Sequence, residues 1–230
     1  MSRKLAKENY ILVVIIIALV VIPITASGNK KIVTAQRIIV IDPGHGGIKN
    51  GLVTSNGLKE KTIALNLAVK TAQKLENRYN VFLTRTRDVD ISPEERIFTA
   101  NKKSADLFVC IHLHSSSESA CLLYYFDLPE PHKQSILTAE NTWKKQSLLH
   151  QSESKKILDS FLNVFSVHKK TKQFFIKGIP LIPLEGASMP AILIEPFSIL
   201  FLSHNPDVME NVLDEYAILI SKSIDLYFRK

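Results

Sequence analysis

From Arg37 to the C-terminus the sequence alternates short apolar runs with longer stretches of helical periodicity, and this alternation restricts the fold more than any other feature. Arg37–Ile41 is an apolar run that ends at the turn Asp42-Pro43-Gly44, which predicts a buried strand. Lys61–Asn77 repeats apolar residues every three or four positions, which predicts a helix. Further strands are expected at Tyr79–Thr84, Leu107–His112, Cys121–Phe126 and Pro190–Glu195, and further helices after Ser92, around Ile157–Phe165 and after Asn205-Pro206. The alternation predicts a single α/β domain with a twisted, largely parallel sheet flanked by helices.

The N-terminal segment has a different character. Arg3, Lys4 and Lys7 precede an uncharged stretch at residues 9–29. Eighteen helical residues at about 1.5 Å each reach about 27 Å, close to the hydrocarbon core of about 30 Å. The stretch fits a permanent membrane anchor, a cleaved secretory signal or a buried core helix. Ile24 stands where a cleavable signal normally has a small residue, which favours the anchor.

Domain boundaries follow from this segment. Residues 1–29 are predicted to be a signal anchor or signal peptide, residues 30–36 a polar linker, and residues 37–230 the folded domain. Either kind of N-terminal segment sends the domain across a membrane, and the positive charges before the apolar run keep the N-terminus cytoplasmic. Residues 128–151 interrupt the alternation, because they are polar and contain two prolines and the only tryptophan, Trp143. We expect them to form an insertion beside the core.

Charge and cysteine content limit the classes of partner and fold. Lysine and arginine outnumber aspartate and glutamate by 29 to 22, and this net charge of +7 suits an anionic polymer, an anionic lipid or nucleic acid. No nucleic-acid recognition motif accompanies the lysines, so nucleic acid is not an expected partner. Two cysteines cannot build a disulfide framework. Cys110 lies inside an apolar run and is expected to be a buried thiol.

Residues of the types that bind metal ions recur near the predicted strand ends. His45 follows the first strand in a loop with three glycines, and His112 and His114 stand at the end of another strand. Because side chains alternate along a strand, His112 and His114 share a face, and spacing does not choose between them. Glu60 begins a helix and Glu195 ends a buried strand. In open α/β sheets functional groups gather at the carboxyl ends of the strands.

Each of these residues also has a purely structural interpretation. His45 can be incidental to a glycine-rich turn, and a strand-end histidine can simply be solvated. The helix dipole favours a first-turn glutamate such as Glu60, and Glu195 can be half of a buried salt bridge. Taken together, two histidines and a carboxylate with one open position instead make a hydrolytic zinc site, beside which a second carboxylate can act as general base.

The order of the motifs makes the chain recognisable. The motifs are IVIDPGHGG at 39–47, the glutamate after GLK at 60, LTRTRD at 83–88, ER at 95–96, AN at 100–101, ADLFVCIH at 105–112, MPAILIEP at 189–196 and FLSHNPD at 201–207. With these residues the chain resembles the zinc-dependent N-acetylmuramoyl-L-alanine amidases of the Amidase_3 family. The resemblance extends from about residue 37 to the C-terminus.

The resemblance implies that His45, Glu60 and His112 hold a Zn²⁺ ion and that Glu195 is the catalytic base. The register of ADLFVCIH puts His112 at the ligand position. His114 stands where the family often has asparagine; it could add a ligand, a proton donor or nothing, and we expect it to contact substrate. The implied reaction is hydrolysis of the amide bond between the lactyl group of N-acetylmuramic acid and L-alanine in bacterial peptidoglycan. The implied location is the cell envelope, on the outer face of the cytoplasmic membrane, with the domain either anchored or secreted.

Two other interpretations stand beside this one: a non-catalytic module that binds peptidoglycan through a degenerate cleft, and a zinc peptidase or deacetylase. Family members usually have one variable residue and then Gly-Phe after the catalytic glutamate. Here Glu195 is followed by Pro196-Phe197-Ser198-Ile199. Residues 128–151 stand where related amidases can carry a regulatory or occluding segment, which leaves room for an unidentified activator protein. Asp42 and Arg96 are expected to hold the scaffold rather than to touch substrate.

Overall fold

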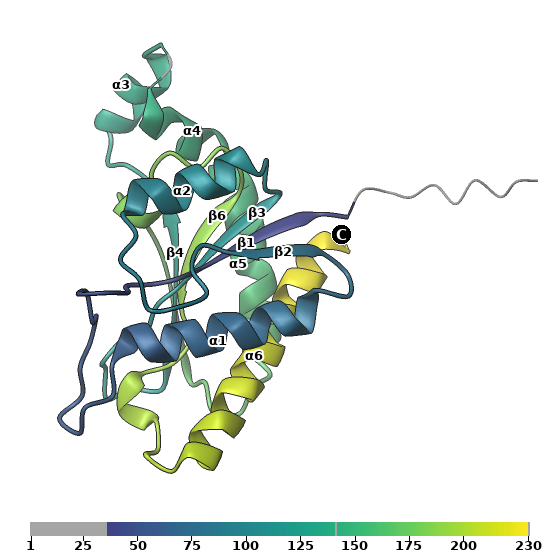
Figure 1. The fold of residues 1–230 in the computed structure, drawn as a ribbon. Coiled ribbons are helices and arrows are strands. Elements are labelled where there is room, and N and C mark those ends of the chain that lie inside the picture. Colours follow the sequence, from purple (N-terminus) through teal and green to yellow (C-terminus); the bar gives the residue numbers. More distant parts are fainter. Residues whose placement is uncertain (1–35, 141, 230) are drawn as a thin grey trace, which may run out of the picture. The chain divides into compact units, whose positions relative to one another are not determined.

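The central feature of the computed structural model, which describes residues 36–140 and 142–229, is a six-stranded sheet (Figure 1). Its strands are β1 (Ile38–Pro43), β2 (Asn80–Leu83), β3 (Leu107–Ile111), β4 (Ala120–Phe126), β5 (Gln173–Ile179) and β6 (Ala191–Glu195). They lie in the order β2-β1-β3-β6-β4-β5. The first four strands in that order are mutually parallel, whereas β4 is antiparallel to β6 and parallel to β5. The predicted α/β fold with a largely parallel sheet is therefore confirmed.

Helices cover both faces of the sheet. They are α1 (Glu60–Leu75), α2 (Pro93–Lys102), α3 (His132–Thr138), α4 (Trp143–Leu149), α5 (Gln151–Phe165) and α6 (Pro206–Phe228), with short 3-10 turns η1 (Ile182–Leu184) and η2 (Ile199–Phe201). Ile39 and Ile41 of β1 belong to the core that packs against α1, α5 and α6. Val40, between them, belongs to the core on the other face, with α2, α4 and η1. Burial on both faces explains why the central strands read as continuous apolar runs.

Helix starts agree with the capping signals of the sequence. Ser92 caps α2: its hydroxyl accepts from the Glu95 amide, and the Glu95 carboxylate accepts from the Ser92 amide. Asn205 caps α6 by accepting from the amides of Asp207 and Val208. Helix α1 begins at Glu60, as expected, and ends at Leu75, two residues before the end of the predicted helical stretch. Unlike α2 and α6, α1 has no side-chain hydrogen bond at its N-cap residue, Lys59.

Three elements were not expected from the sequence. Strand β5 forms an edge of the sheet, where its only neighbour is β4, and most of its residues are exposed or half-buried. Residues 128–151 contain α3 and α4, and α5 continues directly from them at Gln151. Figure 1 shows α3 and α4 at the same end of the molecule as α2.

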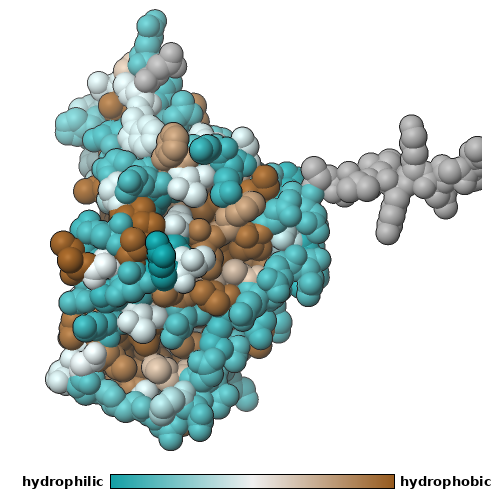
Figure 2. All heavy atoms as spheres, in the orientation of Figure 1, coloured by the Kyte–Doolittle hydropathy of each residue, from teal (hydrophilic) through white to brown (hydrophobic). Residues whose placement is uncertain are grey.

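The face in Figure 2 is largely hydrophilic, with hydrophobic residues gathered between α1 and α2. Helix α2 carries Phe98, which is 61% exposed, and β2 carries the half-covered Phe82. The ammonium group of Lys103 lies 3.5 Å from the centroid of the Phe82 ring and covers part of it.

The predicted anchor or signal at residues 1–29, and all but the last residue of the predicted linker, lie outside the described residues. Within residues 36–140 and 142–229, no helix has both the length and the apolar character needed to cross a bilayer.

Candidate metal centre

The residues of the candidate site gather at the carboxyl ends of β1, β3 and β6. His45 lies two residues after β1, His112 directly follows β3, and Glu195 is the last residue of β6. Backbone bonds extend the sheet into this region: the Gly44 amide donates to the Ile111 carbonyl and the His112 amide to the Ile194 carbonyl, both at 2.9 Å. The sheet thereby sets the spacing between the two histidines and Glu195.

Glu60 joins the two histidines. Its Oε2 atom lies 3.1 Å from His45 Nε2, and its Oε1 atom lies 3.0 Å from His112 Nδ1. Donor atoms of the three residues all lie within 4.8 Å of one another. The structure therefore brings together the three residues that the resemblance singled out as ligands, and their two imidazole nitrogens and one carboxylate oxygen match a donor set found at catalytic zinc sites.

Glu60 is ionised despite its burial. Burial raises the pKa of the carboxyl, but hydrogen bonds from His112, His45 and the Leu52 amide together lower it by a larger amount. The pKa of Glu60 therefore lies well below the ordinary value. Leu52 donates its amide to Oε2 at 2.8 Å and Leu113 donates its amide to Oε1 at 3.0 Å. These two hydrogen bonds fix the orientation of the carboxylate.

Two glycines allow the backbone to approach the ligand residues closely. A Cβ atom on Gly44 would lie 2.5 Å from the His112 ring. A Cβ atom on Gly51 would lie 2.5 Å from both Glu60 Oε2 and His45 Cδ2, and Gly51 has a φ of +65°. Larger residues at these positions would collide with the ligand side chains.

Arginines hold the loop that carries His45, which has a left-handed φ of 58°. Arg96 donates to the carbonyls of Pro43 at 2.8 Å and His45 at 2.7 Å. Arg85 donates to the carbonyls of Pro43 at 3.0 Å and Gly44 at 2.7 Å. Both guanidinium groups are buried, so these bonds stabilise the loop where water does not compete.

Asp42 neutralises part of this charge. Its carboxylate pairs with Arg96 at 2.7 Å and accepts hydrogen bonds from the Thr84 hydroxyl and, at 3.0 Å, from the Cys110 thiol. Cys110 is buried as expected, and burial together with the Asp42 charge raises the pKa of its thiol. Asp42 and Arg96 thus form part of the scaffold. Arg85 was not among the residues expected at the site. In the sequence, only its place in the motif LTRTRD points to it.

Glu195 stands apart from this network. Among the described residues, no hydrogen bond or ion pair engages its carboxylate, and no salt-bridge partner of the kind that a structural role would need is present there. Burial raises the pKa of Glu195 to about 7; the charge of His112 lowers it and the charge of Glu60 raises it. A carboxyl with a pKa near neutrality is suited to accept and return a proton.

His114 lies on the same face but is engaged by its own loop. Its Nδ1 atom accepts from the Ser116 amide at 3.2 Å, so its Nε2 atom carries the proton donated to the Ala120 carbonyl at 3.0 Å. The side chain is buried. Both ring nitrogens of His114 are thus already paired within the protein, whereas His45 and His112 each direct one ring nitrogen at Glu60.

A cavity of about 180 Å³ contains the two histidines. Its walls are Asp42, Gly44, His45, Lys49, Ile91, Pro93, Arg96, His112 and Pro183. None of these residues comes from the insertion as far as it is described (residues 128–140 and 142–151).

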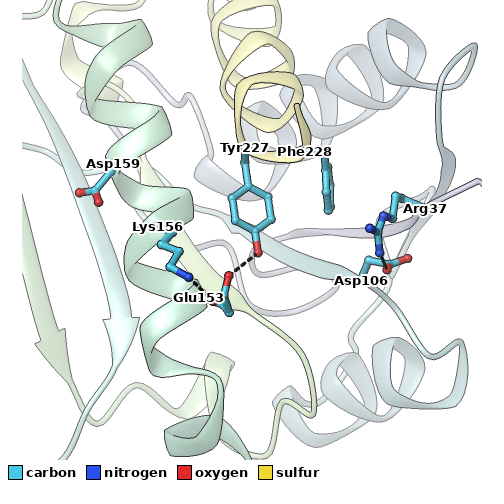
Figure 3. A pocket seen from close by; sticks show the side chains of 7 residues that line it. All are labelled: Arg37, Asp106, Glu153, Lys156, Asp159, Tyr227 and Phe228. Atoms are coloured by element: carbon cyan, nitrogen blue, oxygen red, sulfur yellow. Dashed lines mark hydrogen bonds and ion pairs between the residues drawn. The ribbon is translucent and has the colours of Figure 1, made fainter. Parts of the chain in front are cut away.

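A larger cavity of about 430 Å³ lies at the opposite end of the strands, where Arg37 precedes β1 and Asp106 precedes β3 (Figure 3). Arg37 pairs with Asp106 at 2.8 Å, and the Tyr227 hydroxyl lies 3.4 Å from a Glu153 oxygen. Because this cavity is lined by paired charges at the amino ends of the strands, it takes no part in the metal centre.

Comparison with known proteins places the chain in a family. The model of the N-acetylmuramoyl-L-alanine amidase family, Amidase_3, matches residues 39–224. The sporulation-specific N-acetylmuramoyl-L-alanine amidase of Bacillus subtilis is 35% identical over 161 residues, which are 68% of this chain and 54% of that protein. The endolysin of Bacillus phage SPP1 is 31% identical over 167 residues, which are 70% of this chain and 54% of the endolysin. The chain spans about half the length of these two relatives.

Solved structures share the fold. The CwlD amidase from Clostridioides difficile, solved in complex with the GerS lipoprotein, aligns with a TM-score of 0.66 at 21% identity and covers 84% of this chain and 99% of its own. The region matched by the family model contains His45, Glu60, His112 and Glu195. The chain therefore belongs to the N-acetylmuramoyl-L-alanine amidase family, Amidase_3.

Proposed function

We propose that this chain is a zinc-dependent N-acetylmuramoyl-L-alanine amidase that cleaves the amide bond between the lactyl group and L-alanine of peptidoglycan. The observation that supports it best is the arrangement of three ligand residues around one point, with a carboxylate at the next strand end that has no partner among the described residues. Family membership supplies the reaction class.

His45, Glu60 and His112 would hold the ion. Zinc, when bound at such a site, lowers the pKa of a water molecule towards about 7 and polarises the carbonyl under attack. Glu195 takes the proton from the attacking water and returns it to the nitrogen of L-alanine as the amide breaks. Arg85 and Arg96 act on the backbone of the His45 loop and keep the imidazole in place. His114 stays a proposed substrate contact. Both of its ring nitrogens are hydrogen-bonded within the protein, so the contact would be made by the carbon atoms of the ring.

Muropeptide analysis tests the proposal. Purified cell wall is incubated with the full-length chain, once with added zinc and once with a chelator, and the released products are identified by mass spectrometry. Only the proposed amidase releases stem peptides with a free L-alanine N-terminus, and only in the presence of the ion. If the protein bound to the cell wall but released no product, it would be a binding module. Peptides cut at another bond, or deacetylated sugars, would indicate a different zinc hydrolase.

The location follows from the N-terminal sequence. Residues 1–29 are proposed to anchor or export the chain and residues 30–36 to link that segment to the domain, which then faces the cell wall. An activator protein is part of the proposal only by analogy, since the CwlD amidase of known structure is in complex with the GerS lipoprotein.

A further inference from the structure

Next to the 180 Å³ cavity that contains His45 and His112, called here the first cavity, lies a second cavity of about 340 Å³. Its walls are Glu94, Trp143, Lys144, Ile182 and Glu185. Two peptide bonds connect it to the first cavity, because Pro93 and Pro183 line the first and their chain neighbours Glu94 and Ile182 line the second. The two cavities are therefore neighbours on the surface, and a long substrate that leaves the first on this side passes over the second.

Trp143 forms the aromatic wall of this second cavity. It is the first residue of α4 and is 44% exposed. Its indole lies directly against the backbone of Gly186, where a Cβ atom would come within 1.8 Å of the ring. A large aromatic side chain is thus held in place on one side while nearly half of its surface faces solvent.

Hydrogen bonds hold the platform under Trp143. The Ser147 hydroxyl, one turn further along α4, donates to the Leu184 carbonyl at 2.9 Å and accepts from the Gly186 amide at 2.8 Å. Asn101 of α2 donates to the Gly186 carbonyl at 2.9 Å. The loop that carries Pro183 into the metal cavity is therefore tied to both α2 and α4, so the indole has a defined position relative to the metal centre.

We propose that Trp143 stacks against a sugar ring of the glycan strand, and that residues 128–151 thereby supply a glycan-binding subsite; this rests on the proposed function. A pyranose ring has a face of C–H groups that packs on an indole and an edge of hydroxyl groups that donate to carboxylates. Glu94 and Glu185 provide carboxylates at the same cavity. Its volume is within the range of about 300–1,000 Å³ that is usual for small-ligand sites.

Charge favours the glycan over the stem peptide as the occupant. The second cavity has two carboxylates and a single lysine, Lys144, which lies 3.8 Å from Glu185. The carboxylates of a stem peptide would be repelled there, whereas uncharged N-acetylated sugars would not. The aromatic wall and the excess of acceptors over cations therefore suit a neutral sugar.

Fluorescence tests the subsite directly, because Trp143 is the only tryptophan of the chain. The full-length protein is titrated under chelation, so that nothing is cleaved, with chitooligosaccharide, a neutral glycan of N-acetylglucosamine, and, separately, with free stem peptide. We expect a saturable shift of the emission to shorter wavelength with the glycan and none with the peptide. The absence of a shift with glycan, or an equal shift with the peptide, would overturn the proposal.

Kinetics provide the second test. In Trp143→Ala, the KM for polymeric peptidoglycan should rise about tenfold, which corresponds to about 1.4 kcal/mol, while the KM for muramyl dipeptide, which carries one sugar, changes less than twofold. Trp143→Phe should recover most of the loss. Leu149→Ala, an exposed position at the other end of α4, is the matched control and should leave both values unchanged.

Equal losses on both substrates together with a lower Tm would assign Trp143 a structural role and overturn the proposal. If the wild-type chain released no L-alanine terminus from either substrate, the proposed function would fail, and the fluorescence titration would still decide whether glycan binds at Trp143.

Discussion

At the scale of single residues, Glu60 joins the parts of the candidate metal centre. Each of its carboxylate oxygens contacts one imidazole and one backbone amide. His112 shares its oxygen with the amide of Leu113, whereas His114, two residues away, donates to and accepts from its own loop. Neighbouring histidines on one strand face thus have different hydrogen-bond partners.

This difference predicts different zinc contents for two alanine variants. His112→Ala removes one of three proposed ligands and should sharply reduce bound zinc, because two protein ligands remain. His114→Ala should keep zinc close to the wild-type level, although its loop loses two hydrogen bonds. Elemental analysis of the purified variants measures the outcome, and an equal loss of zinc in both would show that the choice of His112 is wrong.

Glu195→Gln tests the proton transfer. The substitution keeps the size of the side chain but removes the proton acceptor, and acid–base assistance typically contributes about 10²–10⁴-fold to rate. We expect the release of L-alanine termini to fall by a factor in that range while zinc content stays at the wild-type level. A variant that holds zinc and cleaves at the wild-type rate would exclude Glu195 as the base.

The same variant should change how stability depends on pH in the metal-free protein. The pKa of Glu195 is about 7 in the folded chain, against 4.5 for an ordinary glutamate. Between these two values the unfolded chain loses a proton that the folded chain keeps, so the contribution of Glu195 to stability falls as pH rises from 4.5 to 7. The full difference corresponds to about 3 kcal/mol.

Glu195→Gln cannot ionise and avoids this loss. Under chelation it should therefore be more stable than wild type at pH 8 and equally stable near pH 4, as measured by urea denaturation at each pH. A constant difference between the two proteins across the range would mean that the Glu195 carboxyl titrates in the folded chain as it does in water.

At this scale the sequence predicts residues that belong to motifs and misses those that act on distant backbone. His45, Glu60 and His112 stand in motifs next to predicted strand or helix ends, and the structure brings them together. Arg85 was overlooked because its partners are backbone carbonyls of a loop some forty residues earlier. Every residue has such carbonyls, so nothing in the local sequence marks them.

At the scale of elements, the glycines next to the ligand residues provide a controlled prediction. Gly51 and Gly57 both have positive φ, but a Cβ on Gly51 would contact Glu60 and His45, whereas a Cβ on Gly57 meets nothing within 4 Å. Both alanine variants should lose about 1–2 kcal/mol of unfolding free energy to backbone strain. Only Gly51→Ala should also lose zinc affinity, by about 10–100-fold.

Chelator competition measures the zinc affinity of each variant, and Gly57→Ala corrects for strain alone. If both variants bound zinc equally well, the close approach of Gly51 to the ligands would not limit coordination.

The elements that the sequence predicted are those whose periodicity reflects burial. Strand β5 was missed because it lies at the sheet edge with exposed side chains, so no apolar alternation marks it. Helices α3 and α4 are short and polar; α4 is held by tertiary bonds such as that from Ser147 to Leu184, which no local propensity reveals. The reversed direction of β4 and β5 depends on how the chain returns to the sheet, and strand patterns contain no information about direction.

At the scale of the whole molecule, the prediction concerns topology. Three basic residues before the apolar stretch predict a cytoplasmic N-terminus and a domain on the outer face of the membrane. We expect the full-length protein in the membrane fraction, with a domain that protease added to spheroplasts digests. A domain that resists this protease until the membrane is broken would contradict the predicted orientation.

The arginine contacts to the His45 loop have a consequence for the role that we propose for this chain in the cell wall. Carbonyls of three successive residues, Pro43, Gly44 and His45, are bound by the guanidinium groups of Arg85 and Arg96, neither of which is a proposed metal ligand. Under the proposed function, loss of zinc therefore leaves the His45 loop folded and able to bind zinc again. Molecules already exported could then be turned off and on by the supply of the ion around them, with no new synthesis.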